Sequence, residues 1–281
     1  MTDASVMSPN AKGIECAPDG TPLRALDRPE PKYRPLKAWH HFRELLKDKE
    51  DTAEVFKIFE ALPSKDFVPR VRRLMLSEHG ETLRATEAYL PAILDDHDAL
   101  RRLPKGSVAH AYCDFMEREG LTAAGLVEES EKSGHQTYDD LIQFYGFRLR
   151  DTHDLMHVLT GYGRDGLGEQ CVLLFTHGQS PSHGHLLIGY AGAIHMKKMV
   201  KSRAPVFKAV RQAHKTGVAC PPVVGMSIRE LLAMDLEQAR AEFNIPTPSW
   251  YHECHRIWRS EGIDPYDLLA PTKPQEEPAA A

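Results

Sequence analysis

The sequence predicts an all-α protein whose single multi-helix domain extends over about residues 36–260. Apolar residues recur at spacings of three and four in one segment after another, which is the period of an amphipathic helix. Residues that cap helices precede several of these segments, and Gly or Pro follows them. The sequence has no sustained alternation of apolar and polar residues with hairpin turns, the pattern typical of strands. It has no internal repeat either.

Each expected helix is recognised by its apolar face and its ends. The first is marked by Trp39, Phe42 and Leu46. The second begins after Asp51 and ends at Pro63, and its face is formed by Val55, Ile58, Phe59 and Leu62. The third stops near Gly80 and carries Val71, Leu74 and Met75. The fourth is capped by Ser107, ends at Gly120 and carries Tyr112, Phe115 and Met116. Helical periodicity continues over 137–162, 168–177, 182–201, 205–215 and 227–243.

Both ends of the chain are predicted to be disordered tails. Residues 1–35 are rich in proline and contain few large apolar residues, and residues 261–281 combine further prolines with an Ala-rich end. Such segments bury too little apolar surface to offset the entropy of ordering them. The expected organisation is therefore a tail over 1–35, the helical domain over 36–260, and a second tail over 261–281.

Composition limits the class of protein and its compartment. The net charge of −5 argues against a nucleic-acid partner, which requires a basic face. The most apolar stretch, Leu186–Ile194, is too short to span a bilayer, and the N-terminus lacks the features of a secretory signal. Five scattered cysteines without a CxxC pair are typical of a reducing compartment. The sequence thus predicts a protein of the cytosol or of a cytosolic membrane face.

The strongest chemical signal lies in the segment 150–169. His153 and His157 are one helical turn apart, so both imidazoles can reach one metal ion. Asp154 is placed to join them, and Glu169 opens the next helix after a glycine-rich turn. Arg150 lies on the same helix face, where it could pair with a substrate carboxylate or with Asp154.

The same face has a simpler interpretation as the solvated side of a helix, because Asp139 and Gln143 also lie on it. Histidine is an uncommon choice for a solvent-facing stripe, however, and Gly146 and Gly161 reduce helix stability unless something approaches closely. An HExxH protease is disfavoured because an aspartate follows the first histidine. Two imidazoles and two carboxylates form a mixed N/O set that suits Zn²⁺ or another divalent ion such as Fe, Co, Mn or Mg.

The pattern H-D-x-x-H followed by eleven residues and Glu resembles the signature of the Coq4 family of ubiquinone-biosynthesis proteins. It is formed by His153, Asp154, His157 and Glu169, and the flanking Arg150, L-T-G at 159–161 and L-G-E at 167–169 also match. Upstream, residues 34–38, 103–107 and 112–116 are similar to the family as well. The resemblance covers roughly residues 34–200.

This resemblance implies an all-α fold with an apolar tunnel leading to a metal site, usually occupied by zinc. The implied metal ligands are His153, Asp154, His157 and Glu169, and the implied catalytic residues are His153, Asp154 and Arg150. It also implies a lyase-type activity, oxidative decarboxylation, in which the C1 carboxyl of a polyprenylated 4-hydroxybenzoate ring is replaced by a hydroxyl. Partners would be the prenylated quinone precursor and other ubiquinone-biosynthesis proteins. The protein would lie peripherally on the inner face of the cell membrane, or on the matrix face of the mitochondrial inner membrane in a eukaryote.

Two other functions remain open at this stage. One is a non-catalytic scaffold that binds prenylated intermediates and organises the enzymes of the pathway around a structural metal. The other is a phosphohydrolase of the HD type, which the spacing of Glu169 argues against. The sequence leaves open the prenyl length, the native metal and homo-oligomerisation. It also leaves open the roles of His183, His185 and the His252–His255 cluster.

Overall fold

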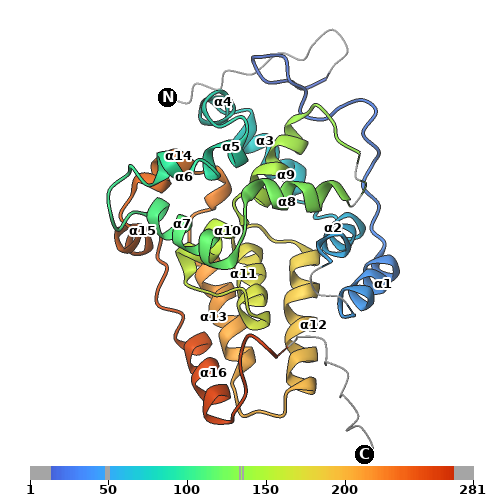
Figure 1. Ribbon diagram of the computed structural model, residues 1–281. Helices are drawn as coiled ribbons and strands as arrows, with labels where there is room; N and C mark the ends of the chain where they lie inside the picture. Colours follow the sequence, from blue (N-terminus) through green and yellow to red (C-terminus); the bar gives the residue numbers. More distant parts are fainter. Residues whose placement is uncertain (1–13, 48–50, 133, 135, 269–281) are drawn as a thin grey trace, which may run out of the picture.

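The computed structural model describes residues 14–47, 51–132, 134 and 136–268. Within these residues the chain is all-α, as predicted, and no helix is both long and apolar enough to cross a membrane. Figure 1 shows the helices packed into one body. They are α1 (Pro35–Leu45), α2 (Thr52–Ala61), α3 (Phe67–Met75), α4 (Glu78–Thr86), α5 (Leu90–Leu94), α6 (His97–Leu100), α7 (Val108–Glu119), α8 (Ala123–Lys132), α9 (Leu141–Asp151), α10 (His153–Thr160), α11 (Gly166–Gln179), α12 (His183–Met199), α13 (Val206–Ala219), α14 (Ile228–Ala233), α15 (Leu236–Glu242) and α16 (Ser249–Ser260), with a 3-10 turn at Val223–Gly225.

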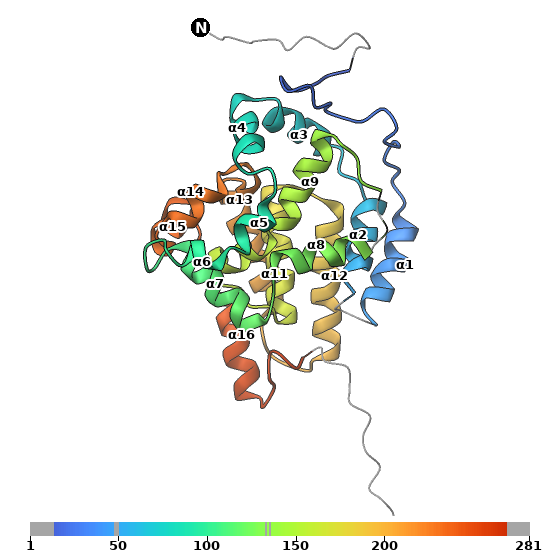
Figure 2. The same cartoon turned by 45° about the horizontal axis from the view of Figure 1, so that its top comes forward.

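The core is built around the close contact of α11 with α13. A Cβ atom added at Gly217 would lie 2.0 Å from the carbonyl oxygen of Phe175, and one added at Gly178 would lie 2.5 Å from that of His214. The two backbones therefore approach more closely than side chains would allow. Figures 1 and 2 show α12 beside this pair and α16 against α13. Helix α11, which carries Glu169, is thus held by the most densely packed part of the molecule.

A separate apolar cluster joins the N-terminal helices to α12. Phe42 of α1, Ile58 of α2 and Ile188 of α12 are buried members of it. Helices α1 and α2 therefore pack on the outer side of α12 (Figure 2). This cluster is separate from the main core, and a third cluster includes Leu23, Val71, Leu141 and Val224.

The expected helix over 137–162 is divided in the structure. Asp140 caps α9 through its side chain, which accepts a hydrogen bond from the backbone N–H of Gln143. Thr152 leaves the α-helical conformation between α9 and α10, and its hydroxyl donates to the carbonyl oxygen of Arg148. Similarly, the expected helix over 227–243 becomes α14 and α15, because Asp235 caps a new helix. In both cases a side chain that hydrogen-bonds to the nearby backbone marks the point at which the expected helix divides into two.

The prediction of a disordered segment over 1–35 differs from the structure at residues 14–34. Leu23 is buried, and Arg28 pairs with Asp140 at 2.6 Å between Nε and Oδ2. The carbonyl oxygen of Pro22 accepts a hydrogen bond from the N–H of Leu141. Polar contacts with α9 thus order a segment that has little apolar surface of its own. Residues 1–13 and 269–281 lie outside the described residues, whereas 261–268 continue from α16.

Two glycine substitutions test the close contact between α11 and α13. We expect Gly217→Ala to lower the free energy of unfolding by about 1–3 kcal/mol, because the new methyl group meets a backbone carbonyl that cannot move away. Gly146→Ala in α9 is the matched control, since nothing lies within 4 Å of its added Cβ. It should raise stability by about 0.5–1 kcal/mol. Urea denaturation followed by circular dichroism measures both, and equal effects would contradict the packing described above.

Candidate metal centre

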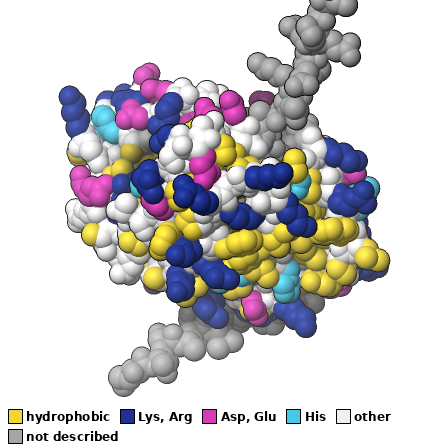
Figure 3. Space-filling model, turned by 90° about the horizontal axis from the view of Figure 1, so that it is seen from below, with side chains coloured by type: hydrophobic (Ala, Val, Ile, Leu, Met, Phe, Trp, Pro, Cys, Tyr) yellow, Lys and Arg dark blue, Asp and Glu magenta, His cyan; other side chains and the backbone are white. Residues whose placement is uncertain are grey.

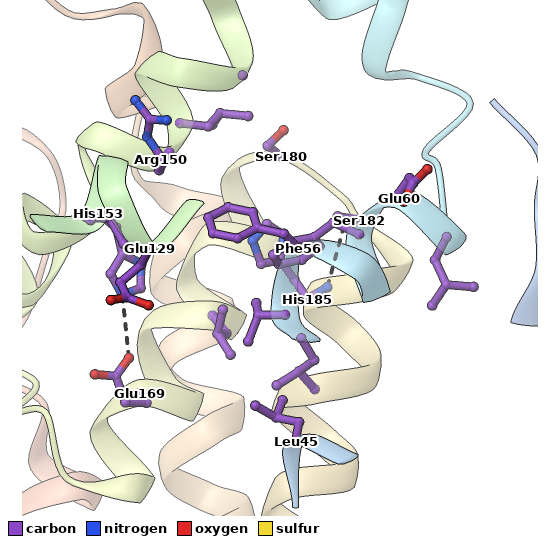
Figure 4. A pocket seen from close by; sticks show the side chains of 18 of the residues that line it. Leu45, Phe56, Glu60, Glu129, Arg150, His153, Glu169, Ser180, Ser182 and His185 are labelled. Atoms are coloured by element: carbon purple, nitrogen blue, oxygen red, sulfur yellow. Dashed lines mark hydrogen bonds and ion pairs between the residues drawn. The ribbon is translucent and has the colours of Figure 1, made fainter. Parts of the chain in front are cut away.

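Three potential ligand atoms converge where α10 faces the first turn of α11. The Nε2 atoms of His153 and His157 are 3.4 Å apart, and Oε2 of Glu169 lies 3.4 Å from the first and 3.5 Å from the second. In Figure 4, His153 and Glu169 face each other on one side of a cavity. Asp154 also belongs to the group, because one of its carboxylate oxygens lies within 4.8 Å of both imidazoles. The structure thus brings together the four residues that the sequence singled out.

The spacing of these atoms fits a metal ion. Zinc–nitrogen and zinc–oxygen bonds of about 2.0–2.1 Å place the donors of a tetrahedral site about 3.3–3.4 Å apart. The observed triangle of His153, His157 and Glu169 has edges of 3.4–3.5 Å. Two imidazoles with carboxylates also form a donor set that divalent ions accept. These residues therefore suit a divalent cation in both geometry and chemistry.

His157 is held in one orientation by its surroundings. Its side chain is fully buried, its ring stacks on Phe115, and its Nδ1 lies 3.1 Å from the carbonyl oxygen of Tyr162. That carbonyl can only accept a hydrogen bond, so Nδ1 carries the proton and Nε2 is left with its lone pair. A backbone contact of this kind fixes the tautomer and the orientation of a metal-ligating histidine.

The charges within the group support one another. Burial acts to lower the pKa of His157, but the nearby Glu169 carboxylate raises it above its ordinary value. Burial acts to raise the pKa of Glu169, but the two imidazoles, His157 foremost, hold it well below its usual range. Glu169 is therefore ionised at neutral pH, which is the state that binds a cation. Its other oxygen, Oε1, lies 3.8 Å from Nε of Arg164.

Arg150 has a different partner from the one that the sequence suggested. Its Nε donates to Oδ1 of Asp151 at 2.7 Å, and its guanidinium lies over the ring of Phe147. The ion pair with Asp151 is nearly buried, and it forms although Asp151 lies away from the helix face of the two histidines. The alternative of a salt bridge to Asp154 is wrong. Arg150 does line the cavity beside His153.

A cavity of about 2020 Å³ opens from the candidate ligands toward the N-terminal helices. Its polar end includes His153, Asp154 and Glu169, and α1 and α2 contribute apolar walls. One face of α12 also lines it, with Ile188, Gly192 and Met199. Met199 is 66% exposed, so the cavity reaches the surface at the C-terminal end of α12. Two glycines of Leu186–Ile194 serve different purposes, since Gly192 lines the cavity and Gly189 packs on Leu174.

Among the described residues, His183, His185, His252 and His255 belong to no group that could hold a metal ion. His185 lines the cavity opposite His153, where its ring packs on Phe59 (Figure 4). Burial lowers its pKa to about 3, so it is neutral. His183 instead contacts the ring of Tyr33. In the C-terminal cluster, His255 lies 3.2 Å from Asp165.

Several residues of the site were not found by sequence reasoning. Asp165 caps α11 by accepting from the N–H groups of Leu167 and Gly168, and an aspartate before a G-L-G-E helix start is a signal that could have revealed it. Arg164 reaches Glu169 from the same turn. The hydroxyl of Tyr251 on α16 accepts a hydrogen bond from the N–H of Gly163 in this turn. Because the two residues are 88 positions apart in the chain, no local sequence pattern could have revealed this contact.

Comparison with known proteins identifies the family. The family of coenzyme Q (ubiquinone) biosynthesis protein Coq4 matches residues 50–249. The mitochondrial ubiquinone biosynthesis protein coq4 of Talaromyces stipitatus is 26% identical over 206 residues, which are 72% of this chain and 68% of that protein. The Saccharomyces cerevisiae protein COQ4 is 24% identical over 80% of this chain and 70% of its own length.

A solved structure supports the same fold. The crystal structure of a Nostoc punctiforme protein, described there as a ubiquinone biosynthesis protein, superposes with a TM-score of 0.56 at 19% identity. It covers 76% of this chain and 100% of the Nostoc chain. The family match extends over most of the chain and includes all four candidate ligands. The chain belongs to the Coq4 family of coenzyme Q (ubiquinone) biosynthesis proteins.

Proposed function

We propose that this protein is a metal-dependent enzyme of ubiquinone biosynthesis that exchanges the C1 carboxyl of a polyprenylated 4-hydroxybenzoate ring for a hydroxyl. The observation that carries this proposal is the triangle of His153, His157 and Glu169 at the polar end of a large apolar cavity. The ring carbon loses its bond to the carboxyl and gains a bond to oxygen. With dioxygen as the two-electron oxidant, one aromatic acid, one dioxygen and one water give the phenol, carbon dioxide and hydrogen peroxide, so the step balances without a further reductant.

The chain's residues divide the task of binding the ring. His153, His157 and Glu169 would hold the ion, with Asp154 beside them, and a bound divalent ion such as Zn²⁺ supplies Lewis acidity. Arg150 lines the cavity three residues before His153, and while its Nε is paired with Asp151, its other guanidinium N–H groups can orient the substrate carboxylate. Fixing the carboxylate in this way would aim C1 at the oxidant.

The rest of the cavity suits a prenyl chain. Its volume of about 2020 Å³ exceeds the roughly 300–1,000 Å³ of sites for small ligands. Phe56, Phe59 and Leu173 line it together with the α12 face. Binding energy from such a remote tail can position the head group at the reacting end. The cavity therefore supports a long apolar substituent on a compact polar ring.

The outer surface near this cavity suits peripheral contact with the membrane that contains such lipids. Leu36 and Trp39 of α1 and Ile194 and Met199 of α12 are exposed. Figure 3 shows an apolar region on the underside of the molecule with Lys and Arg side chains along its edge. Apolar groups that enter the lipid boundary, flanked by cations, are typical of proteins that lie on a membrane. We propose that the protein docks on the inner membrane face beside the other enzymes of the pathway.

Removing one central imidazole tests the metal centre. We expect His157→Ala to lose stoichiometric metal during gel filtration while its helix content stays unchanged, since the ligand is lost and the helix is kept. Metal analysis of the eluted protein and circular dichroism measure the two properties. Retention of one ion per chain would refute the assignment of His157 as a ligand.

A pair of carboxyl-to-amide substitutions tests Glu169 against a neighbouring carboxylate. Glu169→Gln should weaken zinc binding by about tenfold or more, because a neutral amide replaces a charged donor next to both imidazoles. Asp151→Asn is the control, since Asp151 pairs with Arg150 instead of facing the histidines. Competition with a chromogenic chelator gives both dissociation constants. Equal weakening would show that the charge, and not ligation, is responsible.

The reaction is tested in a host that lacks its own family member and accumulates the carboxylated precursor. Expression of this chain should clear the precursor, and His153→Ala should not, because the site has lost a ligand. Lipid mass spectrometry detects both compounds. Equal rescue by the two proteins would favour the alternative of a non-catalytic scaffold for prenylated intermediates. A purified protein that releases carbon dioxide from the precursor would exclude that alternative.

A tryptophan pair tests the docking face. Trp39→Ser should weaken binding to vesicles of neutral and anionic phospholipid by about fivefold or more, because an exposed aromatic ring of α1 is lost. Trp250→Ser is the control, since Trp250 lies on α16 under Lys208. Vesicle co-sedimentation measures both, and an equal loss would place the membrane contact elsewhere.

A further inference from the structure

We propose that Tyr251 of α16 is a positioning residue of the metal centre, which it reaches through a single peptide group. The proposal rests on the metal site of the proposed function and adds a residue that touches neither the ion nor the substrate. Helix α16 would thereby help to hold a metal ligand in place. The family match ends at residue 249, so Tyr251 lies just beyond the matched segment.

The connection is a continuous series of hydrogen bonds. Nδ1 of His157 donates to the carbonyl oxygen of Tyr162 at 3.1 Å. The N–H of the same peptide group, which belongs to Gly163, donates to the hydroxyl of Tyr251 at 3.0 Å. The hydroxyl of Tyr251 then donates to Oδ2 of Asp165. One peptide group thus joins a candidate metal ligand to a tyrosine hydroxyl and a carboxylate.

The same carboxylate also fixes the second candidate ligand. Oδ1 of Asp165 accepts from the N–H groups of Leu167 and Gly168, at 3.1 and 3.3 Å, and so caps the helix that carries Glu169. His255 adds a contact of 3.2 Å to this oxygen. Asp165 therefore acts on His157 through one oxygen and on the position of Glu169 through the other.

The residues of this hydrogen-bond series are buried and closely packed. Tyr162, Asp165 and Tyr251 are all buried, with the rings of the two tyrosines packed edge to face at 5.3 Å. A Cβ atom at Gly163 would lie 2.8 Å from the hydroxyl of Tyr251, and one at Gly168 would lie 1.9 Å from the carbonyl oxygen of Gly163. Glycine at 163 thus allows the turn to approach α16, and glycine at 168 allows the first turn of α11 to pack on the turn.

The arrangement has a clear electrostatic consequence. Burial, and then Asp165, raise the pKa of Tyr251, so its hydroxyl keeps its proton and remains a donor. Its oxygen accepts from Gly163, and chains of hydrogen bonds polarise one another in a buried environment. The carbonyl of Tyr162 becomes a stronger acceptor for Nδ1–H of His157. The imidazole is thereby held in one orientation, with a more basic Nε2 facing the ion.

Tyr251→Phe removes the hydroxyl and keeps the ring. We expect the dissociation constants for Zn²⁺ and Co²⁺ to rise about 10- to 100-fold, the usual effect of losing an outer partner of a metal ligand. The visible absorption spectrum of the Co²⁺ protein should also change, because the orientation of His157 affects the coordination geometry. Asp165→Asn should give a smaller rise, since asparagine still caps a helix but carries no charge.

Tyr112→Phe is the matched control. Tyr112 is also fully buried in the main core, and its hydroxyl has no hydrogen-bond partner among the described residues. Its removal should leave metal affinity and the Co²⁺ spectrum unchanged. Urea denaturation of the metal-free proteins separates general destabilisation from a specific effect on the metal.

The possible results distinguish failure of the positioning role from failure of the proposed metal function. If the wild-type protein binds metal and Tyr251→Phe binds it equally well with the same spectrum, the positioning role is refuted and the metal centre stands. If Tyr112→Phe weakens binding as much as Tyr251→Phe does, the effect is one of core stability, which also refutes the role. If the wild-type protein binds neither ion, both the proposed metal function and this inference fail.

Discussion

The turn between α10 and α11 is the constraint on which the site depends. It must reverse the chain within five residues, 161–165, and still bring Glu169 to within 3.5 Å of both imidazoles. Gly161 ends α10 in the left-handed region at φ +74°, which a residue with a side chain adopts at a cost. Asp165 then begins α11 through its side chain. Because all four candidate ligands are helix residues and the turn between the two helices is fixed, their arrangement is largely formed without an ion.

Two of the buried apolar clusters bear directly on the cavity and on the candidate ligands. The contact between α11 and α13 is close enough to require glycine at 178 and 217. The helix that carries Glu169 is therefore positioned by direct backbone-to-backbone packing. Helices α1 and α2 pack on α12 through side chains, in a cluster of their own. Residues of both clusters line the cavity, since Phe42, Phe59 and Ile188 belong to the cluster of α1, α2 and α12 or pack against it and Glu169 is carried by α11.

Sequence periodicity was sufficient for what depends on helix geometry alone. The spacing of His153 and His157 fixes their common face in any α-helix, and the glycine-rich turn brings Glu169 back toward them. Periodicity could not show that Thr152 interrupts the helix, because one non-helical residue hardly changes the pattern of its neighbours. Nor could periodicity identify Asp151 as the partner of Arg150, because this nearly buried ion pair does not follow the face of the helix. Tyr251 reaches the turn only through tertiary packing, and such contacts leave no local pattern in the sequence.

The charges of the candidate centre suit a cation. Asp154 and Glu169 lie next to two imidazoles that are neutral when they bind a metal ion, so without an ion the group has excess negative charge beside the buried His157. Protons relieve part of this excess, which is why the pKa of His157 is raised although burial opposes its charged form. A divalent ion relieves it more fully and competes with that proton for Nε2. The hydrogen bonds that run from Tyr162 to Asp165 favour the ion in this competition, because they keep the proton of the neutral imidazole on Nδ1 and leave Nε2 open.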